Sequence, residues 1–224
     1  MKGFILAGGK GTRLYPLTKK TPKPLLKVKG KSVLTHLVNL FLKNEISDIA
    51  INIPKRHQSK FDSWQAKNFP DSNINFLVEE SPSGTLNPLK NYMETDLIVS
   101  NGDELKDINI KDMYEWHNKN KAIATVGLIK VKNPKNYGIA VLDDQKIIKF
   151  LEKPSDPPSE YINSGIYILS PKAKNYFPDR CFAMLETDLF PLLAEKRKLH
   201  GYKWSGKWQD IGTPERYKKA QLNW

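Results

Sequence analysis

The chain has 224 residues, the length of one large domain, and its 39% hydrophobic and 27% charged residues are typical of a globular protein rather than a disordered one. Lysine and arginine outnumber aspartate and glutamate by 36 to 24, and the resulting net charge of +12 favours anionic ligands such as nucleic acid, an acidic membrane surface or phosphorylated small molecules. Cys181 is the only cysteine, which excludes an intrachain disulfide framework.

The sequence predicts neither a secretory signal nor a membrane span. The apolar start, residues 3–7, is short and is followed at once by Lys10 and Arg13. No later stretch reaches the roughly 18 apolar residues that a membrane span needs. We therefore expect a soluble, cytoplasmic protein.

The first hundred residues alternate short apolar runs with helical patterns. They predict buried strands over residues 2–7, 48–53, 74–78 and 96–100. Helices are predicted between them over residues 32–43, 55–68 and 86–93, the first with Ser32 as its N-cap. This alternation indicates βαβ units and an α/β fold of the Rossmann-like, doubly wound class, with a mostly parallel mixed sheet and helices on both faces.

After about residue 121 the pattern changes to closely spaced strands. These are predicted over residues 122–131, 138–142, 146–152 and 161–169, with Asp143-Asp144 as a hairpin turn. A helix over residues 188–196, short strands and a final helix after Thr213 complete the chain. We expect a single domain over residues 1–224 whose later part is a more antiparallel, substrate-binding insertion.

The first predicted strand opens into a glycine loop that carries basic residues. Its exposed backbone N–H groups suit a phosphate, and Lys10 and Arg13 add positive charge. A Walker A loop is excluded because no Gly-Lys-Ser/Thr follows, and Pro16 interrupts the helix that a dinucleotide fingerprint requires. The phosphate-binding candidates of this loop are Leu6, Ala7, Gly8, Gly9, Gly11, Thr12 and Arg13.

Lys23 lies between two prolines in Thr21-Pro22-Lys23-Pro24-Leu25, so it stands on a stiff, extended segment. A tight turn with ordinary surface lysines would also explain an isolated glycine cluster. The complete string Gly-Gly-x-Gly-Thr-Arg-Leu followed by Pro-Lys-Pro, however, resembles the signature of the sugar-1-phosphate nucleotidyltransferases, the pyrophosphorylases that make nucleotide sugars.

Further motifs of that family follow in the same order over almost the whole chain. They are Glu80-Ser81-Pro82-Ser83-Gly84-Thr85, Asn101-Gly102-Asp103, Tyr137-Gly138, Glu152-Lys153-Pro154, Asn163-Ser164-Gly165-Ile166-Tyr167 and Trp208-Gln209-Asp210-Ile211-Gly212-Thr213-Pro214. The chain ends at Trp224 without hexapeptide repeats, so it resembles the short, monofunctional members, and we expect no fused acyltransferase domain.

The resemblance implies transfer of a nucleotidyl group from an NTP to a sugar 1-phosphate, with release of pyrophosphate. Residues 1–120 would mainly bind the NTP and residues 121–224 the sugar phosphate. Arg13 and Lys23 would be catalytic through charge neutralisation, and Mg²⁺ would be held by Asp103 and Asp210. The sugar-phosphate ligands implied are Gly138, Glu152, Lys153 and Asn163. The nucleotide-binding residues implied are those of the glycine loop together with Lys23, Glu79, Glu80, Gly84, Thr85 and Asp103.

The base and the acceptor are less sharply defined. Glu79 or Glu80 could accept hydrogen bonds from guanine, and the loop is most similar to that of mannose- or heptose-1-phosphate guanylyltransferases. Uridylyl-, cytidylyl- and thymidylyltransferases acting on another acceptor stay open, because Leu86 and Asn87 replace the small residues that the family commonly has after Gly-Thr.

Two functions of other classes also stay open. One is a nucleic-acid-binding module, suggested by the net charge and by the many lysines between residues 19 and 31; against it, the tryptophans are scattered and no nucleic-acid motif is present. The other is a nucleotide-sensing, non-catalytic paralogue. We expect an NTP and a sugar 1-phosphate as partners, and neither nucleic acid nor a membrane.

Overall fold

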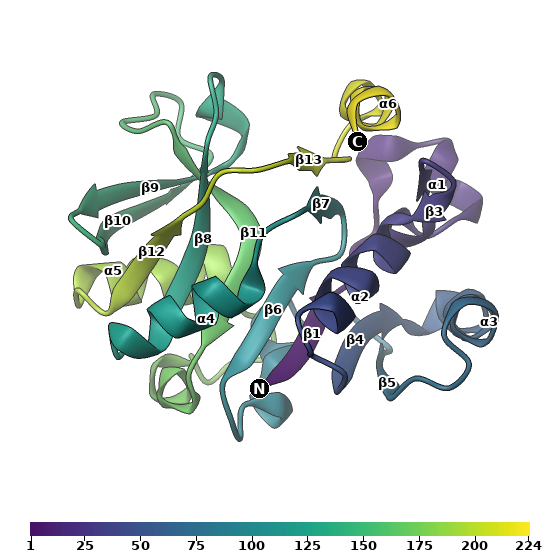
Figure 1. The fold of residues 1–224 in the computed structure, drawn as a ribbon, viewed down its shortest axis with the longest axis horizontal. Helices are drawn as coiled ribbons and strands as arrows, with labels where there is room; N and C mark the ends of the chain where they lie inside the picture. The colour runs from purple at the N-terminus through teal and green to yellow at the C-terminus, as the bar shows by residue number, and fades with distance from the viewer. The chain divides into compact units, whose positions relative to one another are not determined.

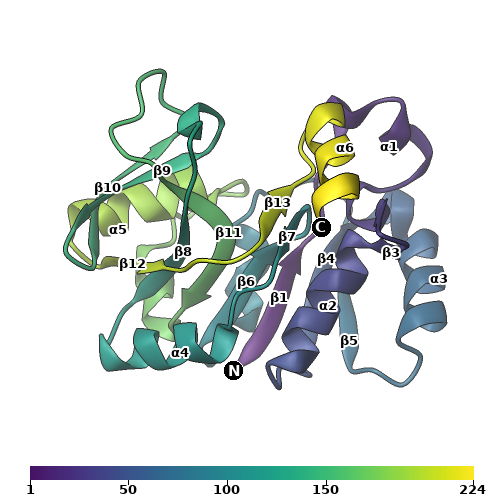
Figure 2. The same cartoon turned by 45° about the horizontal axis from the view of Figure 1, so that its top comes forward.

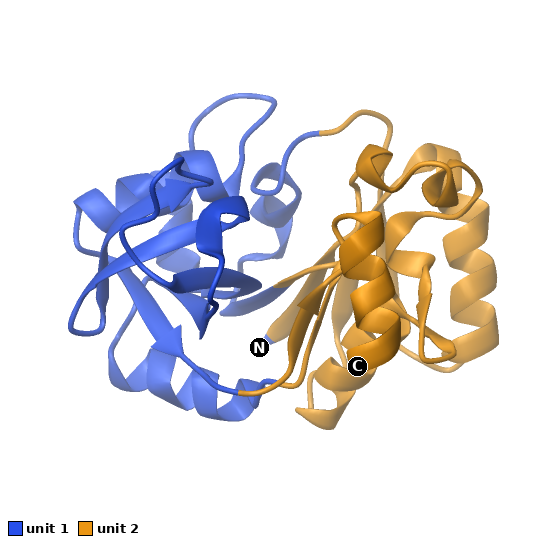
Figure 3. Cartoon of the chain, turned by 90° about the horizontal axis from the view of Figure 1, so that it is seen from above, with its two compact units in different colours: residues 1, 83–99, 108–205 blue, residues 2–82, 100–107, 206–224 orange.

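The computed structural model describes all residues from 1 to 224, which group into two compact units (Figure 3). Unit 1 comprises Met1, Ser83–Val99 and Ile108–Ser205, and unit 2 comprises Lys2–Pro82, Ser100–Asp107 and Gly206–Trp224. The C-terminal segment therefore belongs to the same unit as the N-terminal glycine loop.

Unit 2 contains a parallel sheet in the order β5 (Ile74–Glu79), β4 (Ile49–Pro54), β1 (Lys2–Leu6). The helices α2 (Val33–Lys43) and α3 (Gln58–Asn68) connect these strands and run alongside them (Figure 2). This arrangement is the predicted succession of βαβ units. It places the end of β1, and thus the glycine loop, at the carboxyl edge of the sheet, where α/β proteins bind ligands.

The N-terminus of α2 is capped as predicted. The Ser32 hydroxyl accepts a hydrogen bond from the Thr35 backbone N–H at 3.0 Å, and the indole of Trp64 in α3 donates to the same hydroxyl at 3.1 Å. Gly3 permits close packing of α2 on β1, because a Cβ at that position would lie 2.6 Å from the Phe41 ring.

Unit 2 also contains short elements that the sequence did not predict. They are α1 (Leu17–Lys20), the pair β2 (Lys27–Val28) and β3 (Lys31–Ser32), and β7 (Glu104–Lys106), which pairs with the predicted short strand β13 (Trp208–Asp210). The predicted final helix is α6 (Pro214–Asn223), and the Thr213 side chain caps it. Elements of two to four residues are too short to show a hydrophobic period, so only tertiary pairing defines them.

The strands of unit 1 follow the order β6-β11-β8-β12-β10-β9. Their bounds are β6 (Leu97–Asn101, its first residues in this unit), β8 (Ala124–Lys130), β9 (Gly138–Asp143), β10 (Lys146–Glu152), β11 (Tyr161–Leu169) and β12 (Leu199–Lys203). β9 and β10 form the predicted antiparallel hairpin, and β11 is antiparallel to β8, whereas β12 is parallel to β8. The fold is therefore α/β with a mixed sheet, and its later part is the more antiparallel one, as predicted.

Two helices cover opposite faces of the unit 1 sheet (Figure 1). On one face, His117 of α4 (Ile110–Lys119) contacts Thr125 of β8. On the other, Phe190 of α5 (Phe190–Glu195) packs on Tyr167, whose partner in β8 is Val126. Because Thr125 and Val126 are adjacent in a strand, their side chains point to opposite faces. The sequence reading missed α4, although Ile110, Met113 and His117 recur at helical spacing.

Two predicted helices differ in form from the expectation. The one predicted over residues 86–93 is a 3-10 helix, Asn87–Tyr92, and the one predicted over residues 188–196 begins as a π-helical turn, Leu185–Leu189, before α5. Buried Leu86 and Leu89 hold the first by packing rather than by a long amphipathic face. None of the helices has the length and apolar character that crossing a bilayer requires.

Acidification is expected to destabilise the protein through His117. Its side chain is buried, with Nδ1 2.7 Å from the Thr125 hydroxyl, and burial lowers the pKa of His117 from 6.5 to about 4 despite the opposing charge of Asp96. The unfolded chain takes up a proton near pH 6.5, whereas the folded one does so only near pH 4. This contribution to the free energy of unfolding is therefore present above pH 6.5 and declines by about 3 kcal/mol as the pH falls to 4.

Urea unfolding of the wild type and of His117→Gln between pH 7.5 and 4 measures this effect. The wild type should lose more stability over that interval than the variant, which has no imidazole to titrate. Equal losses in the two proteins would contradict the assignment to His117.

Candidate active site

The glycine loop after β1 forms one wall of a cavity in unit 2. Gly11 adopts a left-handed conformation with φ of 65°, and the chain then makes a 3-10 turn over Thr12–Leu14. The cavity has a volume of about 260 Å³. Its lining residues are Gly9, Lys10, Gly11, Thr12, Arg13, Leu14, Lys23, Asp103 and Gly212. The predicted residues of the glycine loop, Lys23 and Asp103 thus line the same cavity.

Lys23 and Asp103 form an ion pair inside this cavity. Lys23 opens a 3-10 turn, Lys23–Leu25, with Pro22 before it and Pro24 after it, and its side chain is 10% exposed. The Asp103 side chain is 36% exposed. Burial would raise the pKa of the Asp103 carboxyl, but the charge of Lys23 and the hydrogen bond from its ammonium outweigh burial and hold that pKa below its usual value. Asp103 is therefore a carboxylate at neutral pH.

Two further cations line the same cavity. Arg13 and Lys10 are exposed residues of the glycine loop, and Arg13 carries the planar guanidinium that suits bidentate contact with a phosphate. Together with Lys23 they gather positive charge around the backbone of the glycine loop. Such a combination is suited to a polyphosphate.

The backbone segments that contain Asp210 and Asp103 are neighbours. β13 pairs with β7 so that Asp210 is opposite Glu104, and the Ile211 N–H donates to the carbonyl of Asp103 at 3.1 Å. The Asp210 carboxylate is buried and accepts hydrogen bonds from the Gly212 N–H at 2.8 Å and from Arg216 at 3.1 Å. The two residues predicted as metal ligands are thus close in the backbone, Asp210 within β13 and Asp103 directly before its partner strand β7.

These residues fit Mg²⁺ in their donor chemistry. Carboxylate oxygens are the hard ligands that Mg²⁺ prefers, and Mg²⁺ is usually held by one or two carboxylates together with substrate phosphates. No group of three or more His, Cys, Asp or Glu side chains in the chain is arranged to hold a metal ion by itself. A two-carboxylate site beside the glycine loop is therefore the arrangement that these residues could provide.

A buried polar network behind Asp103 escaped the sequence analysis. Glu104 accepts from Asn101 at 3.0 Å and from the Trp208 indole at 2.9 Å, while Lys106 lies 3.7 Å from Glu104. Burial raises the pKa of Glu104 and lowers the pKa of Lys106, although each opposes the shift of the other. The network joins β7 to β13 and so fixes Asp210 in β13 and the turn that holds Asp103 directly before β7. The sequence signal that could have indicated this network is the pair of charged residues, Glu104 and Lys106, directly after Asn-Gly-Asp.

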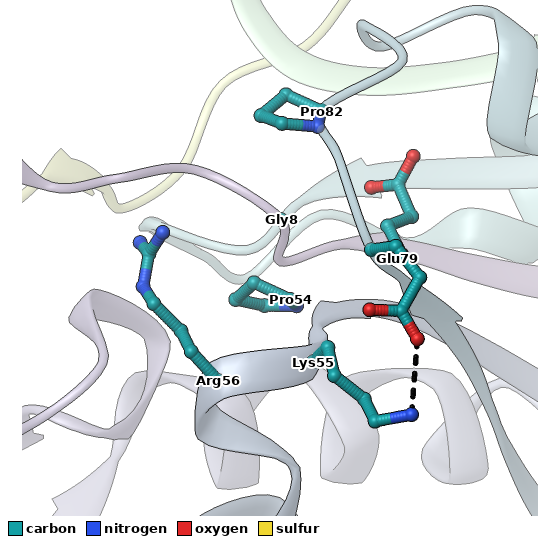
Figure 4. Close-up of a pocket in the computed structure, with 7 residues that line it drawn as sticks. Gly8, Pro54, Lys55, Arg56, Glu79 and Pro82 are labelled. Carbon is teal, nitrogen blue, oxygen red and sulfur yellow. Dashed lines mark hydrogen bonds and ion pairs between the residues drawn. The ribbon is translucent and has the colours of Figure 1, made fainter.

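A second pocket has Gly8 of the glycine loop in its lining (Figure 4). It is lined by Gly8, Pro54, Lys55, Arg56, Glu79, Glu80 and Pro82. Glu79, at the end of β5, accepts a hydrogen bond from the Asn52 amide at 2.7 Å, and Glu80 pairs with Lys55 at 3.0 Å. Both candidate base-reading glutamates therefore line one hollow beside Gly8.

The predicted sugar-phosphate residues gather within unit 1. Gly138 and Glu152 are partners in the β9–β10 hairpin, and a Cβ on Gly138 would lie 3.1 Å from a Glu152 carboxylate oxygen. Lys153 forms an ion pair with Glu152. β11 pairs with β9 at Ile162–Ile139, one residue away from Asn163 and Gly138. The four residues are thus brought together at one end of these strands.

The Gly84–Thr85 loop, also in unit 1, packs on the segment 183–186. The Thr85 hydroxyl accepts from the Leu185 N–H at 2.8 Å and donates to Glu186 at 2.9 Å. Glu186 also accepts from the Tyr167 hydroxyl at 3.5 Å, and the sequence analysis did not single it out. Leu86, which replaces a small residue of the family loop, is fully buried in the core, and its N–H donates to the Ala183 carbonyl at 3.0 Å.

Gly84→Ala is expected to lower the free energy of unfolding by about 3 kcal/mol. Gly84 has φ of 92°, and a Cβ there would lie 2.0 Å from the Ala183 carbonyl oxygen, a backbone atom that cannot move aside cheaply. Gly9→Ala is the matched control, since its Cβ would meet no atom within 4 Å and should change stability by less than about 0.5 kcal/mol. Urea unfolding measures both, and a Gly84→Ala protein as stable as Gly9→Ala would refute the close approach.

Comparison with known sequences gives a consistent result. The sequence matches the Nucleotidyl transferase family over residues 2–224. It is 36% identical over 226 residues to the mannose-1-phosphate guanyltransferase of Yarrowia lipolytica and 33% identical over 229 residues to the mannose-1-phosphate guanylyltransferase of Mycobacterium tuberculosis. The alignments cover 96% and 98% of this chain but 61% and 63% of those proteins, so the chain spans about three fifths of their length.

Solved structures are similar over nearly the whole chain. A candidate glucose-1-phosphate thymidylyltransferase from Bacillus anthracis, solved with sucrose, has a TM-score of 0.89 and 31% identity, covering 99% of this chain and 94% of that one. HddC from Yersinia pseudotuberculosis, complexed with GMP-PN, has a TM-score of 0.82 and 29% identity, covering 98% of this chain and 97% of that one.

Proposed function

Because this chain belongs to the nucleotidyl transferase family, we propose that it transfers a guanylyl group from GTP to a sugar 1-phosphate, giving a GDP-sugar and pyrophosphate. The observation that carries the proposal is the cavity in which the glycine loop, Arg13, Lys23 and Asp103 converge. Mannose 1-phosphate or a heptose 1-phosphate is the acceptor we favour, given the names of the relatives.

The reaction requires alignment and charge neutralisation rather than a general base. The attacking phosphate has a second pKa near ~6 and is largely dianionic at neutral pH. It must approach the α-phosphorus of another polyanion in line with the departing pyrophosphate. Arg13 and Lys10 offset charge on the triphosphate, and Lys23, held in place by Asp103 and its two flanking prolines, contacts the α-phosphate or the attacking phosphate.

The sugar phosphate is assigned to the residues that gather in unit 1. Lys153 binds the phosphate, Glu152 and Asn163 accept or donate to sugar hydroxyls, and Gly138 leaves room for the sugar against the backbone. Asn163 is held in orientation, because its amide donates to the Tyr167 hydroxyl at 2.9 Å and its carbonyl accepts from the Gly165 N–H at 2.8 Å.

Mg²⁺ is assigned to Asp103 and Asp210, whose donor chemistry fits it. When bound, it would withdraw charge from the phosphate oxygens. Asp103 would then interact with both Lys23 and the cation. Arg216 and the Gly212 N–H orient the Asp210 carboxylate through hydrogen bonds.

Guanine is assigned to the pocket of Gly8, Glu79 and Glu80. A carboxylate can accept from both N1–H and the 2-amino group of guanine, whereas uracil and thymine offer a single ring N–H. Arg56 in the same pocket supplies a donor suited to the O6/N7 edge.

Pyrophosphate release with each NTP, Mg²⁺ and a panel of sugar 1-phosphates tests the function. Turnover should be highest with GTP. Turnover highest with dTTP and glucose 1-phosphate would instead establish the thymidylyltransferase alternative, which the Bacillus anthracis structure suggests. Binding of NTP without pyrophosphate release from any acceptor would favour a nucleotide-sensing paralogue.

A further inference from the structure

Asn52 is a lone polar residue in the apolar strand β4, between Ile51 and Ile53. Its side chain is 2% exposed, and its partners across the parallel sheet are Leu6 and Leu77. A buried carboxamide without hydrogen bonds would cost folding free energy, so its bonding pattern is strongly constrained.

Both ends of the Asn52 side chain are engaged. Its carbonyl oxygen, Oδ1, accepts from the backbone N–H of Ala7 at 2.9 Å, and its Nδ2 donates to Glu79 Oε2 at 2.7 Å. The Ala7 N–H also donates to the Asn52 backbone carbonyl at 3.2 Å, and a reversed amide would set its Nδ2 donor against this N–H, so Oδ1 is the end that faces Ala7. This fixes the orientation of the amide, and the group of Asn52 that faces residue 79 is always a donor.

We propose that Asn52 is a positioning residue that sets the hydrogen-bond polarity of residue 79 and thereby the choice of base; this rests on the proposed function of the Glu79 pocket. Glu79 Oε2 accepts a hydrogen bond from Asn52 Nδ2, and in the proposed complex the carboxylate presents hydrogen-bond acceptors to the base. Gly8 lies directly on the pair, since a Cβ there would be 2.8 Å from both Asn52 Nδ2 and Glu79 Oε2. The base pocket is therefore built around the Asn52–Glu79 contact.

The consequence appears when residue 79 becomes an amide. In Glu79→Gln, the donor of Asn52 requires the oxygen of the new carboxamide as its acceptor, which turns the NH₂ group of that carboxamide toward the base. This donor repels the N1–H and 2-amino donors of guanine but matches the 2-carbonyl of xanthine. In Asn52→Asp/Glu79→Gln, residue 52 keeps its acceptor for Ala7 and now accepts from the NH₂ group at position 79, so the carboxamide oxygen faces the base again.

Equilibrium binding of GTP and XTP, with Mg²⁺ and without any acceptor sugar, is the measurement. The wild type should prefer GTP. Glu79→Gln should raise the XTP:GTP affinity ratio by about tenfold to a hundredfold, the span of one to two hydrogen bonds to a base. In Asn52→Asp/Glu79→Gln, the XTP:GTP affinity ratio should be at least about tenfold lower than in Glu79→Gln. Asn75→Asp/Glu79→Gln is the matched control, because Asn75 is exposed on the neighbouring strand β5 and should leave the ratio of Glu79→Gln unchanged.

The outcomes separate the two proposals. A wild type that binds neither nucleotide, or a Glu79→Gln protein with an unchanged ratio, overturns the guanine pocket and the inference with it. A shifted Glu79→Gln ratio that Asn52→Asp does not reverse overturns the role of Asn52 alone. If the double variant fails to fold, Asn52→Ser/Glu79→Gln replaces it. The shorter serine side chain no longer supplies the Nδ2 donor that selects the carboxamide oxygen at position 79, so the XTP:GTP ratio should fall below that of Glu79→Gln, and an unchanged ratio overturns the inference.

Discussion

Asp103→Asn is expected to lower the rate of pyrophosphate release from GTP and mannose 1-phosphate by about 10³-fold, or roughly 4 kcal/mol of transition-state stabilisation. The substitution preserves shape but removes the negative charge that pairs with Lys23 and would hold the divalent cation. Since Lys23 is largely buried, loss of its counterion also leaves a charge poorly compensated, and the melting temperature should fall.

Two comparisons isolate the charge of Asp103 from a general effect. Asp62→Asn makes the same change at an exposed position of α3 and should leave both rate and melting temperature unaltered. Raising the Mg²⁺ concentration should recover part of the Asp103→Asn rate if the residue acts through the cation. A variant that turns over at the wild-type rate at low Mg²⁺ would remove Asp103 from the active site.

Arg13→Ala is expected to reduce kcat/KM for GTP by about 10³-fold while leaving the melting temperature unchanged. Arg13 is exposed, lines the cavity and stands on the glycine loop, so its truncation removes charge at the phosphates without opening the core. Arg13→Lys keeps the charge but loses the planar fork, and we expect an intermediate loss of about tenfold to a hundredfold.

Arg197→Ala is the control for loss of an arginine. Arg197 pairs with Asp143 at 2.5 Å on the surface of unit 1, and both side chains are more than half exposed, so this pair should contribute little. Steady-state kinetics with GTP varied at saturating acceptor distinguishes the variants. If Arg13→Ala were as active as Arg197→Ala, Arg13 would not contact the phosphates of GTP, and the prediction would be wrong.

The predicted strands and the longer helices of the parallel half were confirmed because their signals are local. β1, β4 and α2 have buried residues in short apolar runs or at a period of 3.6, and Ser32 caps α2 through atoms three residues away. The short strands β2, β3 and β7 escaped because a two- or three-residue strand has no period and exists only through its partner. The helix α4 was overlooked despite a readable spacing.

The same distinction separates the candidate site residues that the sequence singled out from the polar residues that only the structure brought to attention. Arg13, Lys23 and Asp103 stand in motifs that could be read directly along the chain. Asn52, Glu186 and Glu104 stand in none of these motifs, and their importance lies in contacts with Ala7 and Glu79, with Thr85, and with Trp208. The only sequence signal for Asn52 was its position as a polar residue inside an apolar run, and this signal did not indicate that Glu79 is its hydrogen-bond partner.

The sequence by itself determined the family resemblance, the α/β class and the identity of the charged residues in the motifs, because each is encoded in residues that are neighbours along the chain. Only the tertiary structure decided that Lys23 pairs with Asp103, that Leu86 belongs to the core, and that the Asn52 amide faces Glu79 with its donor. These facts depend on burial and on which atoms remain to satisfy a buried polar group, and both are set by packing between segments distant in sequence. The structure also locates part of the excess positive charge of the sequence, because Lys10, Arg13 and Lys23 line a single cavity.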